Sequence, residues 1–576
     1  MHQTVEAFNH YSVHLKYIFE KIGFLTRASP LWLGCLAFFV LLMIFLNRNR
    51  NQKTEKHFYL SDTFFILAII CSILILRTPY LLYTQLNPDE TQWIIGAATF
   101  AKYPHFWLSV DATTSGPLVV IPLSIVVWIG GILNYATARL FATCFFLIPS
   151  VLFVYYSTKK MFTKEIADFI TIVVAFLVST QTVLLNYNGE FSIILFTSAS
   201  LYFYSKIDVA KAPLYLYGIT GFIVSCLPFT KPQAIPIGFM LFLIISYKIY
   251  LNHRITNRLL IFIMGCSIPF VFLIIYLQIN DLFKDFYYSY ILNSIYYGSA
   301  SGTVKRDIPF FEVLWKTIQY LFYEVDVPLY FIFSIAVGTW GIIHLIRKDG
   351  FISKIKSSQH FNFHFAISLF LCALFCVVKP KTFFVAYQNT LLIPTSFLLA
   401  NGLFVIRNRL NKQQFFTMFV VIMLSFSSLF IVKLHWDEAK WFVYNEHLRN
   451  IKLIETVQKN STVDERMAIW GYKPDLFLEC GRLQGTRDGH SLCSMRENVI
   501  KDYYLNRYLH DLQTIRPKII LENFEGIYNI FNFGPQPRRD FGIDKFPTVY
   551  KYVKENYILI ADFDNNTRIF LRKASI

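Results

Sequence analysis

Three carboxylates lie close together in the sequence, at the edge of an apolar region, where they are candidates for acid–base chemistry. Asp89 and Glu90 follow the helix-breaking Pro88, and Asp111 comes after an aromatic-rich segment at 103–107. Ionised groups at a membrane boundary are costly to remove from water, so their presence indicates a function. A carboxylate in a partly dry site can serve as a general base. The alternative is structural: Asp89 and Glu90 cap the following helix, and Asp111 lies in a turn.

A second group of charged residues lies at the ends of other apolar runs. Lys231 separates two such runs, Lys379 and Lys381 separate two more, and Arg139 lies at the start of another. Lysines at the outer ends of spans are disfavoured by the positive-inside rule, and cations at that depth suit a lipid phosphate. In the alternative interpretation the lysines extend to solvent. Glu190 is a further acidic residue of this kind, either a ligand contact or a helix cap.

The composition is that of a membrane protein with many spans. Of the 576 residues, 55% are hydrophobic and 16% are charged, and the mean hydropathy is +0.44. A soluble domain carries about 25% charged residues. The net charge of +17 comes from Lys and Arg in short loops, which the positive-inside rule assigns to the cytoplasm, so no nucleic-acid partner is expected. The sequence has no nucleotide-binding phosphate loop, no His-Glu-x-x-His zinc motif and no Gly-x-Ser-x-Gly elbow, which argues against ATP hydrolysis, zinc proteolysis and serine hydrolysis.

Apolar runs long enough to cross a membrane, or nearly so, succeed one another along most of the chain. They lie at 31–46, 62–83, 117–133, 138–157, 166–184, 190–205, 213–228, 233–251, 258–279, 328–346, 361–378, 385–405 and 414–434. The basic loops are mutually consistent only if one early run fails to cross. The best candidate is 117–133, which is short and contains two prolines. The prediction is a polytopic α-helical membrane protein with about 12 crossings, both termini outside and the charged residues above on the external side.

Two domains are expected, a transmembrane domain at 1–435 and an external α/β domain at 436–576. The first has external loops at 84–137 and 280–327, and the second of these is either a lid or a packed pair of interfacial helices. In the second domain, helices are expected at about 437–459 and 495–514 and strands at 466–470, 518–521 and 557–560. Its two cysteines, Cys480 and Cys493, are predicted to form a disulfide if the domain faces an oxidising compartment.

The order of these residues resembles the GT-C superfamily of membrane glycosyltransferases, in the branch of bacterial protein O-mannosyltransferases and aminoarabinose transferases. The matching segments are 89–90 (Asp-Glu), Asp111 with 115–118 (Ser-Gly-Pro-Leu), 138–140 (Ala-Arg-Leu), 188–190 (Asn-Gly-Glu), 230–232 (Thr-Lys-Pro), Tyr387 with Pro394, 468–471 and 516–520. Many relatives have His-Tyr where this chain has Tyr387 and Gln388, and an Arg near Lys379 or Lys381. No single match is specific, but their order and common side are.

The resemblance implies transfer of a sugar from a polyprenyl-phosphate donor to an envelope lipid, polysaccharide or protein, with inversion at the anomeric carbon. The implied location is the bacterial inner membrane, with the active site and C-terminal domain in the periplasm. No cofactor is implied with certainty, and a divalent cation stays open. The implied site residues are Asp89 as base with Glu90 and Asp111 beside it, Lys231, Lys381, Arg139 and Tyr387 for the donor phosphate, and Glu190 and His105 for other parts of the substrates.

Two other classes of function stay open at this point. One is a transporter or a flippase of lipid-linked sugars, and the other is an envelope scaffold or a polysaccharide polymerase of another type. Transporters carry inverted repeats and charges at mid-membrane depth. Here the charges gather at one face and no internal repeat is visible, so glycosyl transfer is the favoured hypothesis.

Overall fold

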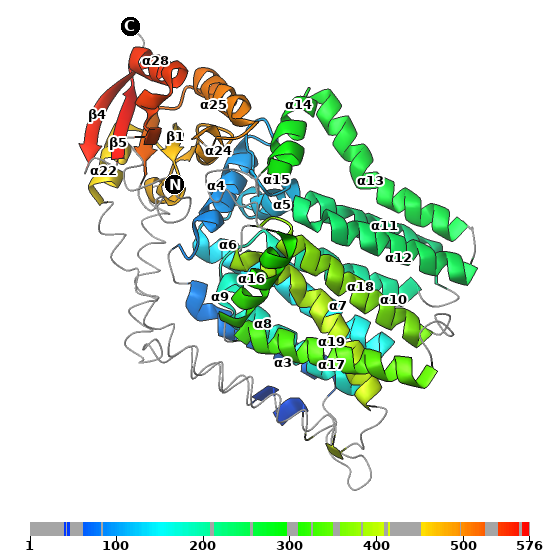
Figure 1. Cartoon of the computed structure of the whole chain (residues 1–576). Helices are drawn as coiled ribbons and strands as arrows, with labels where there is room; N and C mark the ends of the chain where they lie inside the picture. Colours follow the sequence, from blue (N-terminus) through cyan, green and yellow to red (C-terminus); the bar gives the residue numbers. More distant parts are fainter. Residues whose placement is uncertain are drawn as a thin grey trace.

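The structure is a computed structural model, and it describes most of the chain. The described residues are 40–41, 43–45, 61–81, 85–207, 212–253, 257–296, 309–323, 326–349, 358–381, 384–407, 413–414, 417, 451–495, 497–524, 540–563 and 567–574. They form a large helical bundle and a smaller domain with a sheet, at the top left of Figure 1.

Helices make up the whole bundle (Figure 1). They are α3 (Asp62–Leu81), α4 (Pro88–Lys102), α5 (Pro117–Trp128), α6 (Tyr135–Ala142), η1 (Thr143–Leu147), α7 (Ile148–Met161), α8 (Lys164–Thr180), α9 (Thr182–Leu185), α10 (Glu190–Ile207), α11 (Leu214–Cys226), η2 (Leu227–Phe229), η3 (Pro232–Ala234), α12 (Ile235–His253), α13 (Asn257–Ile279), α14 (Phe283–Asp285), η4 (Phe286–Leu292), α15 (Asn293–Tyr296), α16 (Phe310–Tyr323), α17 (Asp326–Asp349), α18 (Ser358–Val378), η5 (Val385–Leu391) and α19 (Leu392–Arg407).

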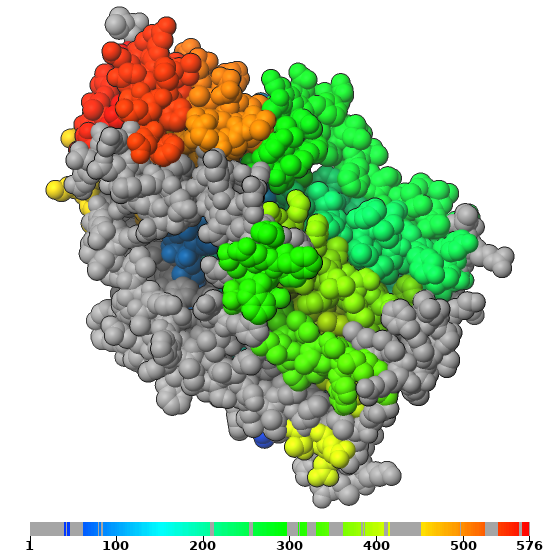
Figure 2. All heavy atoms as spheres, in the orientation of Figure 1, coloured from blue at the N-terminus to red at the C-terminus, as the bar shows by residue number. Residues whose placement is uncertain are grey.

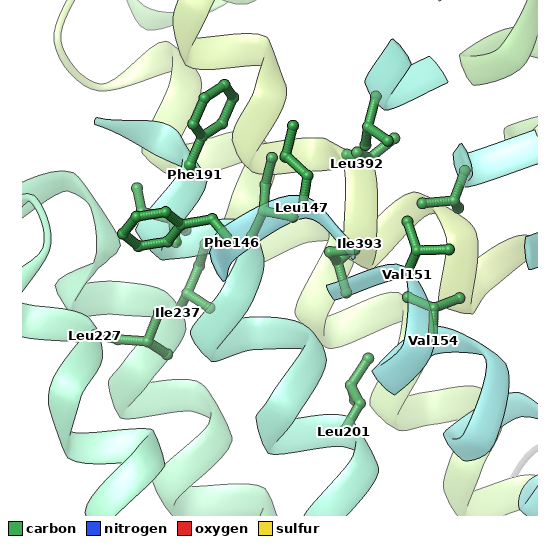
Figure 3. Close-up of a cluster of buried hydrophobic side chains, with 14 of the residues drawn as sticks. Phe146, Leu147, Val151, Val154, Phe191, Leu201, Leu227, Ile237, Leu392 and Ile393 are labelled. Atoms are coloured by element: carbon green, nitrogen blue, oxygen red, sulfur yellow. The ribbon is translucent and has the colours of Figure 1, made fainter. Parts of the chain in front are cut away.

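The bundle core is one continuous cluster of buried aliphatic and aromatic side chains. Figure 3 shows part of it, where Val151 of α7, Leu201 of α10 and Ile393 of α19 are buried among their neighbours. Elsewhere glycines set the distance between helices. A Cβ on Gly265 of α13 would lie 2.1 Å from the carbonyl oxygen of Gly218 in α11, so only glycine permits this approach. Small residues at such contacts are typical of helices that associate within a membrane.

Each predicted apolar run contains a helix where the structure describes it, although residues 129–133 of the run at 117–133 are not helical, and the runs at 31–46 and 414–434 lie mostly outside the described residues. Five described spans are long and apolar enough to cross a membrane: Tyr135–Met161, Pro232–Asn252, Asn257–Ile279, Phe361–Val378 and Ala386–Arg407. Shorter apolar helices occupy Pro117–Trp128, Leu214–Phe229 and Tyr330–Gly341. The polytopic helical fold is thus confirmed, and the count of about 12 crossings stays a prediction.

Helix α5 is short, as its prolines and glycines suggested. Its 12 residues span about 18 Å, against the about 30 Å of a bilayer core. It lies along α4, where the hydroxyl of Ser124 donates to the carbonyl of Ala97 over 2.9 Å and the indole of Trp128 donates to the carbonyl of Ala101 over 3.1 Å. This length and packing agree with a helix that does not cross.

The C-terminal domain is built on a five-stranded mixed sheet with the order β2-β1-β3-β5-β4. Its strands are β1 (Arg466–Gly471), β2 (Leu483–Gln484), β3 (Ile519–Asn523), β4 (Tyr557–Phe563) and β5 (Thr567–Arg572). Its helices are α22 (Ile451–Asn460), α23 (Asp475–Cys480), α24 (Leu492–Met495), α25 (Lys501–Ile515), η6 (Ile543–Lys545) and α28 (Pro547–Asn556). Strands β1, β2 and β3 are parallel, and β5 pairs antiparallel with β3 and β4.

Both faces of this sheet are covered, which explains the unbroken apolar runs of β1 and β3. Ala468 and Trp470 pack on one face with side chains of α25 and α28. Met467 and Ile469 pack on the other face with α22, α23 and Ile95 of α4. Central parallel strands buried on both sides carry runs of consecutive apolar residues, as 467–470 and 519–521 do here.

Helix α4 belongs to both domains and positions the site described below. Ten of its residues are buried, from Glu90 to Phe100. Trp93, Ile94 and Ala97 lie in the bundle core, whereas Ile95 lies in the core beneath the sheet. Side chains at the N-terminus of α4 are therefore held in place by both domains.

Residues 283–296, from the predicted 280–327 loop, form a second connection between the domains. Tyr288 stacks on Tyr503 of α25 with ring centroids 4.4 Å apart. In Figure 2, green atoms of this part of the chain lie beside orange atoms of the C-terminal domain. The loop residues at 297–308 lie outside the described residues, so the structure supports packed helices for this segment and leaves the lid interpretation untested.

The C-terminal predictions met different outcomes. The three predicted strands and the helix at 495–514 correspond to β1, β3, β4 and α25, while β2 and β5 had no counterpart in the prediction. The boundary between 435 and 436 lies outside the described residues.

The predicted disulfide between Cys480 and Cys493 is wrong in this structure. Both sulfurs are thiols. Cys480 packs beneath the sheet with Leu476 and Phe477, whereas Cys493 packs with Ile500 and Tyr504 in a different cluster. The two cysteines are close in sequence but lie in different clusters, because β2 and the turn that follows it take the chain from one cluster to the other.

Candidate active site

The start of α4 separates the two adjacent carboxylates. The Asn87 side chain caps the helix by accepting the backbone N–H of Asp89 at 2.9 Å, and Pro88 occupies the first helical position. Asp89 is exposed, while Glu90 is fully buried at 0%. Successive residues of a helix point about 100° apart, so neighbours in the sequence face different surroundings. Because Asn87 provides the side-chain cap, Asp89 is not needed for that purpose.

Glu90 forms a buried ion pair with Arg139 of α6. The guanidinium donates to both carboxylate oxygens, at 2.8 and 2.6 Å, and both side chains are 0% exposed. The backbone N–H of Tyr187 donates to the same carboxylate at 2.7 Å, and Arg139 also donates to the carbonyl of Tyr80 at 2.7 Å. This pair joins α4, α6, the end of α3 and the segment before α10. Glu90 was expected beside the base and Arg139 at the donor phosphate; here each is bound to the other.

Asp89 is in contact with the C-terminal domain. The hydroxyl of Tyr472, the residue that follows β1, donates to Asp89 Oδ1 at 2.5 Å. The ring of His490 packs edge-on against Tyr472, with centroids 5.0 Å apart. Tyr472 and His490 are buried, at 7% and 6% exposure. Asp89 thus retains Oδ2 for another proton donor, because an ionised carboxylate accepts at both oxygens.

Lys231 is buried and faces the bundle interior. Prolines at 228 and 232 break the helix around it into η2 and η3, and Lys231 itself has extended backbone between them. Its ammonium binds Glu190 Oε1 at 2.6 Å and lies 5.2 Å from the ring of Trp93 and 5.4 Å from that of Tyr387. At 4% exposure the side chain does not extend to solvent.

Polar atoms without a hydrogen-bond partner among the described residues gather around Lys231. They are Oε2 of Glu190 and Oγ of Ser115, and Oε1 of Gln388 is a third such atom in the residue after Tyr387. Gly189 provides room there: a Cβ on it would lie 2.5 Å from Lys231 Cε and 3.4 Å from Ser115 Oγ. Buried polar atoms are nearly always satisfied, so such a group indicates a place where water or a ligand completes the bonding.

Asp89 and Lys231 are near one another through α4. Asp89 and Trp93 are four residues apart on the helix, hence on the same face and about 6 Å apart along the axis. Trp93 contacts Lys231, and Asp89 is close enough to Glu190 for their charges to interact. Trp93 is thus a common neighbour of an exposed carboxylate, about one helical turn away on α4, and of a buried cation, 5.2 Å from its ring.

Asp111 lies in a buried network between the domains. Its Oδ2 accepts from Arg507 of α25 at 2.7 Å, and its Oδ1 accepts from the N–H of Thr113 at 2.9 Å. The same guanidinium binds Asp488 at 2.7 Å. Burial raises the pKa of Asp488 to about 7; Arg507 opposes this shift and the charge of Asp111 adds to it. Two carboxylates that share one guanidinium repel each other, so one of them gains a proton readily.

A second arginine completes this network. Arg487 binds Asp511 at 2.8 Å and Asp285, next to η4, at 2.9 Å. Tyr503 donates to Asp285 at 2.6 Å. Asp111 thus connects the loop after α4 to the C-terminal domain.

Two further predicted residues lie apart from these contacts. His105 is exposed in the turn after α4, where its carbonyl accepts from the hydroxyl of Ser109 at 2.7 Å. Lys381 follows α18 with a backbone φ of 57°, in the left-handed region, and is half-buried. Among the predicted residues, the structure brings together Glu90 with Arg139, and Glu190 with Lys231 and Tyr387.

The described residues contain no group of three or more His, Cys, Asp or Glu side chains placed to hold a metal ion. An acidic cluster at Asp111, Asp285, Asp488 and Asp511 is bound by Arg487 and Arg507.

Comparison with known proteins gives the fold. No family model matches the chain, and no curated protein matches its sequence. A solved structure of ArnT from Cupriavidus metallidurans bound to undecaprenyl phosphate superposes with a TM-score of 0.52 at 11% identity, over 89% of this chain and 99% of that one. The chain has the GT-C fold. The resemblance noted in the sequence is thereby confirmed at the level of the fold.

A more distant similarity is to the archaeal oligosaccharyltransferase AglB from Archaeoglobus fulgidus. Its complex with an inhibitory peptide and a dolichol-phosphate matches 95% of this chain and 75% of that one, at 10% identity and a TM-score of 0.42. A form of the enzyme from the same organism tethered to an acceptor peptide matches 96% of this chain at a TM-score of 0.43.

Proposed function

We propose that this protein is an integral membrane glycosyltransferase that moves a sugar from a polyprenyl-phosphate donor to an envelope lipid, polysaccharide or protein. The observation that carries the proposal is that the exposed Asp89 and the buried Lys231 are both neighbours of Trp93, on a GT-C fold. The ArnT structure with this fold is bound to undecaprenyl phosphate, a lipid of the proposed donor class.

The proposed reaction is an inverting displacement. The acceptor hydroxyl attacks the anomeric carbon, the new bond forms between these atoms, and the bond from that carbon to the phosphate oxygen breaks. Asp89 takes the proton of the hydroxyl, and the lipid phosphate leaves with the electron pair. Lys231 offsets the charge that develops on this phosphate, in a dry place where such an interaction is strong.

The surroundings of Lys231 support a donor head group there. Trp93 and Tyr387 offer aromatic surfaces to a sugar or prenyl chain, and Ser115 and Glu190 offer polar atoms that have no other partner in the described structure. Since the donor arrives through the membrane, no nucleotide-binding fold is required. We place the site and the C-terminal domain on the periplasmic side of a bacterial inner membrane, from the charge bias of the loops.

Two substitutions separate the proposed roles. Asp89→Asn keeps the size of the side chain and removes its basicity, so turnover should fall by roughly 10²–10⁴-fold. It should leave the binding of undecaprenyl phosphate to the purified protein unchanged. Lys231→Ala should instead weaken that binding.

Turnover is measured as the envelope glycan or lipid that mass spectrometry finds missing from a deletion strain and restored by the wild-type gene. Near-normal restoration by Asp89→Asn would falsify the assignment of the base. Lipid movement across vesicles without covalent transfer would instead favour a flippase.

A further inference from the structure

The contact between Tyr472 and Asp89 joins residues 383 positions apart and belonging to different domains. We infer that Tyr472 is a positioning residue for Asp89, and that the C-terminal domain completes the active site by supplying it. The inference rests on the proposed function, since it takes Asp89 as the base.

The first step is the chemistry of the hydrogen bond. The phenol donates to Oδ1, and the backbone N–H of Asp89 donates to Asn87. The carboxylate is therefore fixed at one oxygen, and Oδ2 is the oxygen left for an acceptor hydroxyl. A donor hydrogen bond to an ionised carboxylate favours the ionised form, which is the form that acts as a base. It also limits rotation of the side chain, so the free oxygen keeps one orientation.

The second step is how Tyr472 itself is held. It follows Gly471, the last residue of β1, whose φ is 125° and whose backbone lies against that of Asn523 in β3: an added Cβ would be 1.8 Å from the Asn523 carbonyl oxygen. Only glycine permits this turn. The edge of His490 then supports the tyrosine ring. The phenol is thus fixed by the sheet and by a buried neighbour.

The third step is how the domain is held on the bundle. Arg507 binds Asp111, from the loop after α4, and Arg487 binds Asp285, next to η4. The Arg507–Asp111 pair is almost entirely buried, whereas the Asp285 side chain is 21% exposed, and buried pairs of this kind fix geometry more than they add stability. They place the carboxyl end of β1 above the start of α4. The interdomain network orients the C-terminal domain, and Tyr472 of that domain then contacts the base Asp89.

Tyr472→Phe tests the inference, because it removes the hydroxyl and keeps the ring against His490. Loss of a hydrogen bond to a charged group should lower kcat by about 10- to 100-fold. The acidic limb of the pH–activity profile should move to higher pH, because the ionised carboxylate has lost a hydrogen-bond donor. The rate measured is that of product formation in membranes from the native host, which supply donor and acceptor. The product is the glycan missing from a deletion strain.

Tyr503→Phe is the matched control. It removes another interdomain hydroxyl, the one on Asp285, without touching Asp89. The acidic limb of its pH–activity profile should stay at the wild-type pH. The double variant Asp89→Asn with Tyr472→Phe should be no slower than Asp89→Asn alone, because the hydroxyl acts only through that carboxylate. Each variant is also checked for wild-type binding of undecaprenyl phosphate, which a misfolded protein would lose.

The outcomes distinguish this inference from the proposed function. If Asp89→Asn is inactive while Tyr472→Phe has the wild-type rate and pH profile, the positioning role is wrong and the base assignment stands. If Tyr472→Phe and Tyr503→Phe lose the same activity with no change in the acidic limb, the phenol only holds the domains together. If Asp89→Asn keeps full activity, the proposed function fails first, whatever Tyr472→Phe does.

Discussion

Replacing Glu90 should unfold the protein, whereas replacing its neighbour Asp89 should only inactivate it. In Glu90→Gln, a neutral amide would face the Arg139 guanidinium at a site that is 0% exposed. The carboxylate now accepts two hydrogen bonds from Arg139 and one from the N–H of Tyr187. Arg77 is also close enough for its charge to interact with both members of the pair. Loss of the negative charge would leave these cations together with nothing to balance them.

The magnitude follows from burial. Removing one partner of a buried ion pair costs about 3–5 kcal/mol, because the other charge remains without compensation. In Asp89→Asn the exposed side chain loses only the favourable interaction of a charge with the helix N-terminus, about 0.3–1 kcal/mol. The free energies of unfolding of the two variants should therefore differ by at least about 2 kcal/mol.

The assay is unfolding in mixed micelles of mild detergent and SDS, followed by tryptophan fluorescence, with all variants measured in parallel. The double variant Glu90→Met with Arg139→Met removes both charges and should recover much of the lost stability, since apolar side chains can replace a buried pair. Wild-type stability of Glu90→Gln would refute the reasoning. If that variant were also inactive, Glu90 would take part in the chemistry after all.

Two further predictions concern the phosphate site and the domain interface. Gly189→Ala places a methyl group 2.5 Å from Lys231 Cε, and this flexible side chain can shift. We therefore expect binding of undecaprenyl phosphate to weaken by about tenfold with little loss of stability. Unchanged binding would mean that Lys231 does not hold the phosphate. Asp488 has its pKa raised to about 7 in the folded protein, so the stability that its protonated form contributes is complete below about pH 4 and is lost as pH rises through about 7. Asp488→Asn is neutral at every pH, so its stability relative to the wild type should rise as pH increases from about 5 to about 8 in the same unfolding assay. A stability difference that does not change with pH would contradict the assignment.

Much of the fold was predictable because hydropathy alone distinguishes helices in a membrane. Every predicted run that the structure describes contains a helix, and β1 and β3 were recognisable because burial on both faces makes 467–470 and 519–521 apolar. Strand β5 escaped prediction because charged Arg568 and Arg572 interrupt its apolar residues, and its pairing with β3 decides its conformation. Such pairing depends on contacts that no local pattern records.

The site was predictable only in part, because residue type and spacing do not reveal burial. Asp89 and Glu90 are equivalent in the sequence, yet one is exposed and the other is bound by Arg139, 49 residues away. The tyrosine that contacts Asp89 was missed although a signal existed: Tyr472 follows the carboxyl end of a parallel strand, the edge at which functional residues of α/β domains gather.

The charge at Lys231 decides how a phosphate fits there. Glu190 already neutralises the ammonium, so an arriving phosphate would appear to meet a site with no net charge. An ammonium has three N–H donors, however, and Glu190 Oε1 accepts only one of them. A phosphate oxygen can therefore bind Lys231 while the ion pair persists, and Glu190 then orients the ammonium toward it. The acidic residue beside the cation is compatible with phosphate binding, because it leaves N–H donors of the ammonium for the phosphate oxygens.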